Sequence, residues 1–218
     1  MVGTAPTEGR RERKKRETRE RISDVATGMF LERGFDAVTV AEIAEAADVS
    51  VNTVYNYFPA KEDLFFDREE EMVDRPARAV RDREPGESAA DAILGGMRRD
   101  IRDRSLYAGM MEGYDDFMRV VRESPALIAR LMMMQQRTAD RLRVTLQEET
   151  GAEPGDPLPE LVASQLVHVS NVVFRAAVRG IAEGRSKDEV ARESLAKLDA
   201  FETLTTDAFL NYATRAGR

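Results

Sequence analysis

The stretch from Thr39 to Leu64 reads TVAEIAEAADVSVNTVYNYFPAKEDL, and it decides the fold of the N-terminal part of the chain. Thr39 stands three residues before Glu42, which is the pattern of a capping box at the start of a helix. Apolar residues then recur at helical spacing until residues 48–50 interrupt them, and Ser50 is suited to cap a second helix. The stretch therefore predicts a helix-turn-helix, an arrangement that offers its second helix to the major groove of DNA.

The predicted second helix has an apolar stripe and a polar side. We expect Tyr55 to pack within the stripe, beside Val54 and Phe58. Amides bond to base edges, and threonine contacts either a hydrogen-bonding group or a thymine methyl group. The residues suited to bases are therefore Asn52, Thr53 and Asn56, with Val51 as a methyl contact. No arginine or lysine lies on this side, so the commonest guanine contact is missing.

Three segments carry a resemblance to a known family: ERGFDAVTV at 32–40, IAEAADVS at 43–50 and NTVYNYFPAKEDLF at 52–65. At these residues the chain resembles the TetR family of bacterial transcription regulators. The resemblance covers about the first third of the chain. It implies that Thr39, Tyr57 and Lys61 contact phosphates, as their hydroxyl and ammonium groups allow. The DNA-binding set expected in this way is Thr39, Ser50, Val51, Asn52, Thr53, Asn56, Tyr57 and Lys61.

Two residues depart from the family pattern. Asp48 replaces the usual turn glycine, and aspartate accepts left-handed backbone geometry at some cost. Ala60 replaces a common serine cap before Lys61. Neither change removes the residues that are expected to face the groove.

Composition limits the other classes of function. The 218 residues include no cysteine and one histidine, so we expect no metal site and no disulfide. No Gly-x-Ser-x-Gly turn or acid-base pair supports catalysis, so the chain is not expected to be an enzyme. No run of about 18 apolar residues and no apolar stretch behind the charged start is present, so we expect a cytoplasmic protein without a membrane segment.

A local excess of basic charge precedes the helix-turn-helix. The net charge of the chain is -7, so any contact with nucleic acid must be local. Residues 10–21 hold eight basic residues against three acidic ones. Such a run is either a solvated tail or a phosphate-binding arm. We expect residues 1–17 to be a flexible basic arm that binds DNA through Arg13, Lys14, Lys15 and Arg16, and residues 18–66 to be the helix-turn-helix domain.

The remaining chain, residues 67–218, also has helical periodicity and no persistent alternation of the strand type. Pro76 is expected to end the helix that starts at Lys61. Capping pairs at Ser88 with Asp91 and at Ser186 with Glu189 open later helices. The predicted fold is all-α: a three-helix DNA-binding domain, then a helical domain for ligand binding and dimerisation, with about nine helices in total.

Twofold symmetry and the resemblance both imply a homodimer, because one headpiece offers a single short reading helix. The last two helices have more apolar surface than one-sided burial needs, and they are the expected interface, with a purely internal role as the alternative. The resemblance also implies a small-molecule effector in the second domain. The expected pocket residues are Met97, Tyr107, Met111, Tyr114, Met134, His168, Asn171, Phe174 and Arg175.

Methionines adapt to irregular apolar shapes, so the expected effector is lipophilic or amphiphilic, although methionine is also ordinary core filler. Ser164, His168, Asn171 and Arg175 form a polar stripe on one helix face, which lines the pocket, lies in the dimer seam or faces solvent. The leading hypothesis is a homodimeric repressor that a small molecule releases from a palindromic operator. An architectural or adaptor protein without an effector, and a transcriptional activator, are the alternatives.

Overall fold

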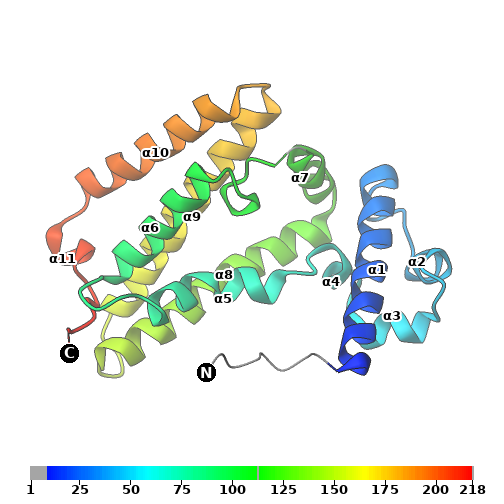
Figure 1. Cartoon of the computed structure of the whole chain (residues 1–218), viewed down its shortest axis with the longest axis horizontal. Coiled ribbons are helices and arrows are strands. Elements are labelled where there is room, and N and C mark those ends of the chain that lie inside the picture. The colour runs from blue at the N-terminus through cyan, green and yellow to red at the C-terminus, as the bar shows by residue number, and fades with distance from the viewer. Residues whose placement is uncertain (1–8, 112, 218) are drawn as a thin grey trace, which may run out of the picture. The chain divides into compact units, whose positions relative to one another are not determined.

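The computed structural model describes residues 9–111 and 113–217, and all the regular structure within them is helical (Figure 1). The expected all-α class is confirmed. Eleven α-helices and one 3₁₀ helix form in this part of the chain, where about nine helices were expected. They are α1 (Arg10–Arg33), α2 (Val40–Ala46), α3 (Val51–Tyr57), α4 (Lys61–Phe65), α5 (Glu69–Arg81), α6 (Ala89–Arg102), η1 (Leu106–Ala108), α7 (Tyr114–Glu123), α8 (Pro125–Thr150), α9 (Leu158–Ala182), α10 (Lys187–Leu204) and α11 (Asp207–Leu210).

The chain divides into two compact units. The headpiece holds the residues up to Arg68 together with Arg119–Ile128, and the body holds Glu69–Met118 and Ala129–Arg218. The sequence had placed everything after residue 66 in the second domain. Residues 119–128 belong instead to the headpiece, where the Ser124 hydroxyl donates to the Asp36 carboxylate at 2.9 Å. A contact between segments so far apart in sequence leaves no trace in local periodicity.

The headpiece is built around one apolar core. It contains buried residues of α1, α2 and α3 and the residue that follows α3: Ile22, Ala26, Phe30, Ile43, Ala44, Val54 and Phe58. Phe35 folds back on the last turn of α1, with its ring centroid 4.9 Å from that of Phe30. Gly34, between them, ends α1 with a positive φ of 83° that a side chain would disfavour. This core fixes α2 and α3 against α1.

The N-terminal arm differs from expectation. Residues 1–8 lie outside the described part, and from Arg10 onward the expected flexible arm is helix. Ion pairs one turn apart join Arg13 to Glu17 and Arg16 to Glu20, at 3.6 and 3.5 Å. Such pairs support helix formation without any tertiary contact. The basic run is therefore a continuation of α1.

The expected end of a helix at Pro76 is wrong. The break falls earlier, after Phe65, and α5 then runs from Glu69 through the proline to Arg81. Proline removes one backbone donor from a helix interior, at a cost of about 3 kcal/mol. Tertiary burial offsets this cost, because Val73, Ala77 and Val80 form one buried face of α5.

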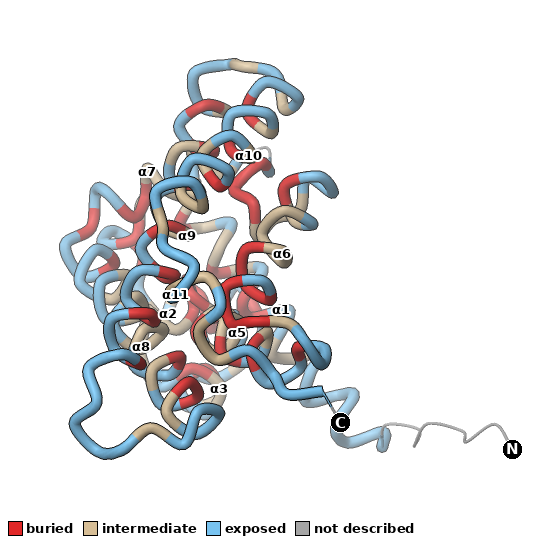
Figure 2. Tube along the Cα trace, turned by 90° about the vertical axis from the view of Figure 1, so that its left-hand side faces the viewer, coloured by how far each residue is buried: buried red, intermediate tan, exposed pale blue. Residues whose placement is uncertain are grey.

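The core of the body is formed mainly by α6, α9 and α10, which contact one another. Ile93 and Leu94 come from α6, Leu166 and Val173 from α9, and Leu198 from α10. The expected capping boxes are present at Ser88 with Asp91 and at Ser186 with Glu189. In Figure 2 the red, buried positions of these helices alternate with blue, exposed ones, which is the pattern of helices covered on one side.

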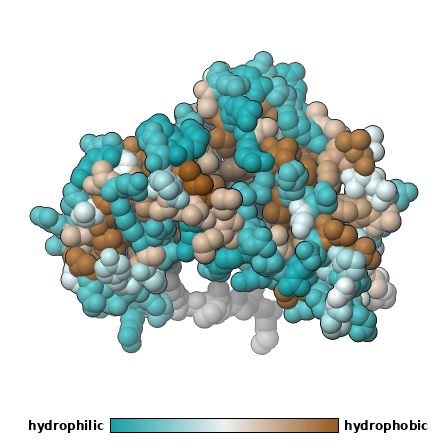
Figure 3. Space-filling view, turned by 180° about the vertical axis from the view of Figure 1, so that it is seen from behind, coloured by the Kyte–Doolittle hydropathy of each residue, from teal (hydrophilic) through white to brown (hydrophobic). Residues whose placement is uncertain are grey.

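Helix α9 combines length with apolar composition. By length and composition it could cross a membrane, a test that core helices of soluble proteins also pass, and 39% of its most apolar window is buried within the protein. Its outer face leaves Leu158, Leu161 and Val172 exposed. Figure 3 shows patches of hydrophobic residues, in brown, among hydrophilic ones on the face that it displays. The body therefore keeps uncovered apolar surface as a single chain.

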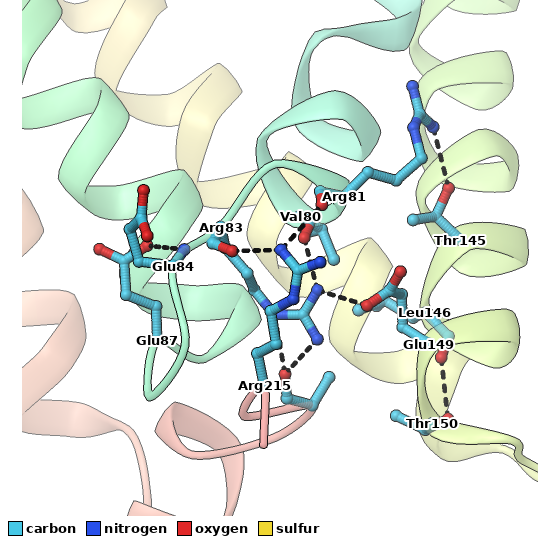
Figure 4. A network of polar contacts seen from close by, with 11 residues as sticks. Val80, Arg81, Arg83, Glu84, Glu87, Thr145, Leu146, Glu149, Thr150 and Arg215 are labelled. Atoms are coloured by element: carbon cyan, nitrogen blue, oxygen red, sulfur yellow. Dashed lines mark hydrogen bonds and ion pairs between the residues drawn. The ribbon is translucent and has the colours of Figure 1, made fainter. Parts of the chain in front are cut away.

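A polar network ties the C-terminal tail to the body (Figure 4). The Arg83 side chain, only 2% exposed, donates to the Glu149 carboxylate at 2.6 Å and to the Ala213 carbonyl at 2.9 and 3.1 Å. The Arg215 backbone exchanges hydrogen bonds with Gly86 and Glu87, each 2.9 Å long. The end of α5, the end of α8 and the tail are thereby joined at one buried cation.

Candidate nucleic-acid interface

The start of α2 is closed by the predicted capping box. The Thr39 hydroxyl accepts from the Glu42 amide at 3.2 Å and donates to the Glu42 carboxylate at 2.7 Å. Arg33 donates to the same carboxylate group at 2.7 Å. The Thr39 hydroxyl, the Arg33 guanidinium and the Thr39 amide lower the pKa of Glu42 to about 2. A phosphate at Thr39 therefore competes with Glu42 for the hydroxyl proton.

The turn between α2 and α3 depends on one residue in the left-handed region. Asp48 has a φ of 52°, the left-handed geometry predicted for an aspartate that replaces the usual turn glycine. The Val49 amide then donates to the Ala44 carbonyl at 2.9 Å. Next, the Ser50 hydroxyl accepts from the Thr53 amide at 3.0 Å and caps α3. The turn thus fixes where α3 begins and which side chains it presents.

Helix α3 presents a mixed amide and aromatic face. Asn52 and Asn56 are exposed, and so is Val51, at 40%. Tyr55 was expected to pack inward, and this expectation is wrong, because Tyr55 is 47% exposed. With seven residues, α3 buries only Val54 at its middle, with Phe58 just after its end, and Tyr55 lies about 100° around the helix from Val54. Tyr55 therefore joins the amides on the outer face.

Two residues of the expected set are partly withdrawn from solvent. The Thr53 hydroxyl lies 2.7 Å from the Ser50 hydroxyl, so both belong to the cap of α3. Tyr57, the last residue of α3, is half-buried. These residues support the geometry of α3 as well as offering polar groups at its edge.

Lys61 occupies a more specific position than the sequence indicated. Its ammonium donates to the Phe35 carbonyl at 2.6 Å and lies 4.3 Å from the centroid of the Phe35 ring. Partial burial lowers the pKa of Lys61, and the nearby Asp36, Glu62 and Glu42 carboxylates oppose that shift. A phosphate contact by Lys61 therefore has to share or replace the bond to Phe35.

Arg19 is a headpiece residue that sequence reasoning missed. Its guanidinium lies 4.4 Å from the centroid of the Phe58 ring and donates to the Asp67 carbonyl at 3.1 Å. The Ser23 hydroxyl also donates to the Asp67 carboxylate, at 2.9 Å. Only the helical spacing could have indicated this role: Arg19 lies one turn before Ser23, near the side of the helix that carries Ile22 and Ala26.

Comparison with known proteins agrees with this geometry. The sequence model of the bacterial regulatory proteins of the tetR family matches residues 22–67. The chain is also similar to the HTH-type transcriptional regulator TcmR of Streptomyces glaucescens, with 28% identity over 77% of this chain and 76% of TcmR. Residues 22–67 are a DNA-binding domain of the TetR family. The chain is a DNA-binding transcription regulator, and the headpiece is its helix-turn-helix unit.

Two further comparisons bear on different parts of this regulator. The HTH-type transcriptional repressor KstR of Mycolicibacterium smegmatis is 39% identical, over 29% of this chain and 35% of KstR. The solved structure of SmeT in complex with triclosan has a TM-score of 0.59 and 17% identity, covering 93% of this chain and 98% of SmeT. The likeness to SmeT shows that the fold extends through the body.

The body of the regulator brings some predicted effector residues together. The Tyr114 ring lies 5.4 Å from that of Phe174, and burial raises the pKa of Tyr114 to about 12. Met97 lies on α6, where the Ser170 hydroxyl contacts its sulfur at 3.2 Å. Gly109 approaches α9 so closely that a Cβ there would lie 2.9 Å from the Val178 side chain. Gly109 and Tyr114 are thus packed against α9.

Other predicted effector residues lie apart from that cluster. Tyr107 turns to α5, where its hydroxyl donates to Glu71 and its ring lies 3.9 Å from the Arg75 guanidinium. Met111, His168 and Arg175 are exposed. Met134 and Asn171 are half-buried. In the polar stripe, Ser164 shares the exposure of His168 and Arg175, so most of the stripe faces outward from the single chain.

The body also has a surface hollow that sequence reasoning did not indicate. The hollow has a volume of about 290 Å³ and is lined by Val73, Arg137, Asp140, Arg141 and Val144. Hydrogen bonds to Glu70 raise the pKa of Arg137, which also bonds to Glu69. The arginines are therefore already neutralised by α5. The hollow coincides with none of the predicted effector residues.

Proposed function

We propose that this regulator is a homodimeric repressor that binds a palindromic operator and leaves it when a small molecule enters the body. The observation that carries the proposal is the outer face of α3, where Val51, Asn52, Tyr55 and Asn56 are exposed together over a buried core. Amide groups bond to base edges, and apolar groups contact thymine methyl groups. A rigid reading face is what sequence-specific binding needs.

The proposed dimer uses the outer face of α9. Leu158, Leu161, Gln165, His168, Val172 and Arg175 are all exposed, and their spacing alternates between three and four residues, which places them on one helix face. Leu161 is 57% exposed, and on α10 Leu204 is 87% exposed. Pairing with a second copy would cover this surface and place the polar residues of the stripe beside the seam. Two reading helices would then bind one palindrome.

The proposed effector site lies around Gly109, Tyr114 and α9. Met97, Tyr114 and Phe174 are retained from the expected set, with Asn171 at the edge, whereas Tyr107, Met111 and Met134 lie apart from them. His168 and Arg175 fit the proposed dimer seam better, because they lie on the outer face of α9. Apolar and aromatic groups suit a lipophilic or amphiphilic ligand. The triclosan complex of SmeT supports a small-molecule site in this fold. We further propose that the protein acts in the cytoplasm and by binding, without catalysis or cofactor.

Selection of bound duplexes from a random pool tests the DNA-binding part of the proposal. We expect a palindromic consensus. Asn52→Ala and Asn56→Ala should each relax preference at particular positions, at a cost on the order of 1 to 3 kcal/mol. Gln136→Ala, which removes an exposed amide from α8, serves as the control. Recovery of the same consensus with unchanged affinity from both asparagine variants would show that the reading face is misassigned.

The dimer has its own test. Leu161→Glu places a charge on the outer face of α9 and should convert the protein to monomers in sedimentation equilibrium. Val144→Glu, at a position on α8 that is 40% exposed, should leave the dimer intact. If the Leu161→Glu variant remains a dimer, the proposed interface is wrong.

A further inference from the structure

The first turns of α1 carry basic charge that the headpiece core does not use. Residues 10–17 are all exposed, and the first buried residue of α1 is Ile22. Figure 2 shows this end of α1 in the colour of exposed residues. Within the described residues, Arg13 and Arg16 are paired with glutamates, whereas Arg10, Arg11, Lys14 and Lys15 have no ion-pair partner. Four cations are thus available for an external anion, and their directions around the helix decide which of them lie beside α3.

The position of these cations opposes local helix stability. The N-terminus of a helix carries partial positive charge, and a basic side chain there is unfavourable by about 0.3 to 1 kcal/mol. Arg10 and Arg11 occupy the first turn of α1, with Glu12 as the acidic residue of that turn. Basic residues that stand at a helix N-terminus without a compensating contact inside the protein are often retained for function.

The helix register gives Arg11 and Lys15 a direction. They are four residues apart, and Ile22 follows Lys15 by seven, so all three lie on one side of α1. Ile22 is buried in the headpiece core. One turn beyond Lys15, Arg19 stacks on Phe58, the residue that ends α3. The side of α1 that faces α3 therefore continues past the end of α3 as a basic surface.

From these observations we infer that Arg11 and Lys15 form a phosphate-binding ledge beside α3, which contacts the DNA backbone next to the bases that α3 reads. This inference rests on the proposed DNA-binding face. The two residues are about 6 Å apart along the helix axis, while one DNA strand carries a charge every 3.4 Å or so along its axis. The ledge can therefore meet about two phosphates.

The phosphate-binding residues of the basic run are therefore not the four that the sequence indicated. Of Arg13, Lys14, Lys15 and Arg16, only Lys15 belongs to the ledge, and Arg11 joins it. Arg10 and Lys14 are rotated by about 100° from Arg11 and Lys15, toward the side of α1 away from the core. The net charge of -7 makes such a local contact necessary, because the whole surface does not attract DNA.

The chain supplies a matched pair of variants for the test. Arg11→Ala with Lys15→Ala removes the ledge. Arg10→Ala with Lys14→Ala removes the same two residue types, at the same spacing, from an adjacent side of the same turns. Full-length wild type and both double variants are titrated with a fluorescent 30-base-pair duplex, at salt concentrations from 50 to 200 mM. Circular dichroism verifies that each protein has equal helix content.

The ledge variant should lower the slope of log K against log salt by about 1.8 and raise Kd at 0.1 M salt by on the order of tenfold or more. The matched variant should change the slope by less than half as much. Equal losses in both variants would mean that overall charge acts without a ledge, and no loss in either would overturn the inference. If wild type binds no duplex at low salt, the proposed DNA-binding function itself fails, which is a distinct result.

Discussion

Lys61 donates a hydrogen bond from its ammonium to the backbone carbonyl of Phe35, at 2.6 Å. Phe35 follows Gly34, where α1 ends, and Lys61 begins α4. The bond therefore joins two helix ends through a carbonyl whose residue is buried. A charged donor bonded to a buried acceptor contributes more to stability than an ordinary surface contact does. Lys61 is thus a structural residue of the headpiece, whatever it contributes to DNA binding.

Lys61→Met should destabilise the headpiece. The methionine keeps most of the side-chain length but removes the donor, so the Phe35 carbonyl loses its partner, at a cost on the order of 1 to 3 kcal/mol. Urea denaturation followed by circular dichroism measures the change. Lys14→Met, at an exposed position, is the control. Unchanged stability combined with weaker DNA binding would instead assign Lys61 to phosphate contact alone.

Tyr55→Ala and Val54→Ala change neighbouring residues but should have opposite effects: the first should weaken DNA binding, and the second should lower stability. Tyr55 is 47% exposed, so its loss should change the free energy of unfolding by no more than about 0.5 kcal/mol while weakening DNA binding. Val54 is fully buried, so its truncation should cost on the order of 2 kcal/mol. Thermal denaturation and operator titration separate the two effects. Strong destabilisation by Tyr55→Ala would show that the ring packs inward.

Glu42 should make the stability of the headpiece sensitive to acid. Its pKa in the folded protein is lowered to about 2 from 4.5, first by the Thr39 hydroxyl and then by Arg33. A depressed folded-state pKa stabilises the fold above the unfolded value, so this contribution is present above pH 4.5 and is lost as the pH falls toward 2. The difference in Tm between wild type and Glu42→Gln should therefore shrink between these limits. A difference that stays constant with pH would contradict the linkage.

Arg83→Ala should be among the most destabilising single changes in the body. It leaves the Glu149 carboxylate and the Ala213 carbonyl without their shared donor. Removing one partner of a fully buried ion pair typically costs about 3 to 5 kcal/mol, and the expected loss here is smaller because the Glu149 side chain is 28% exposed. Arg81→Ala is a nearby control, because Arg81 pairs with Asp74 while 40% exposed. Similar urea midpoints for the two variants would show that the buried network adds little.

The local elements were predictable from sequence because their determinants lie within one turn. Thr39 with Glu42, Ser88 with Asp91 and Ser186 with Glu189 each form the capping box that their spacing indicated. Asp48 adopts the left-handed geometry that the missing glycine required. Pro76 shows the limit of this reasoning, because burial of one face of α5 outweighs a local breaker.

The candidate site was predictable only in part. The exposure of Asn52 and Asn56 followed from their positions opposite Val54, whereas Tyr55 could not be placed, because an aromatic ring at the edge of a stripe can turn either way. The proposed ledge of Arg11 and Lys15 depends on α1 beginning at Arg10, and a highly charged segment gave no tertiary signal of that start.

The sequence by itself determined that this regulator is helical, where its capped helices begin, and which residues fill the headpiece core, since these follow from spacing along the chain. Only the tertiary structure decided that Lys61 bonds to Phe35, that residues 119–128 belong to the headpiece, and that Arg83 gathers the tail. These contacts join segments separated by tens of residues or more. Their energy depends on which surfaces meet, and no local pattern encodes that meeting.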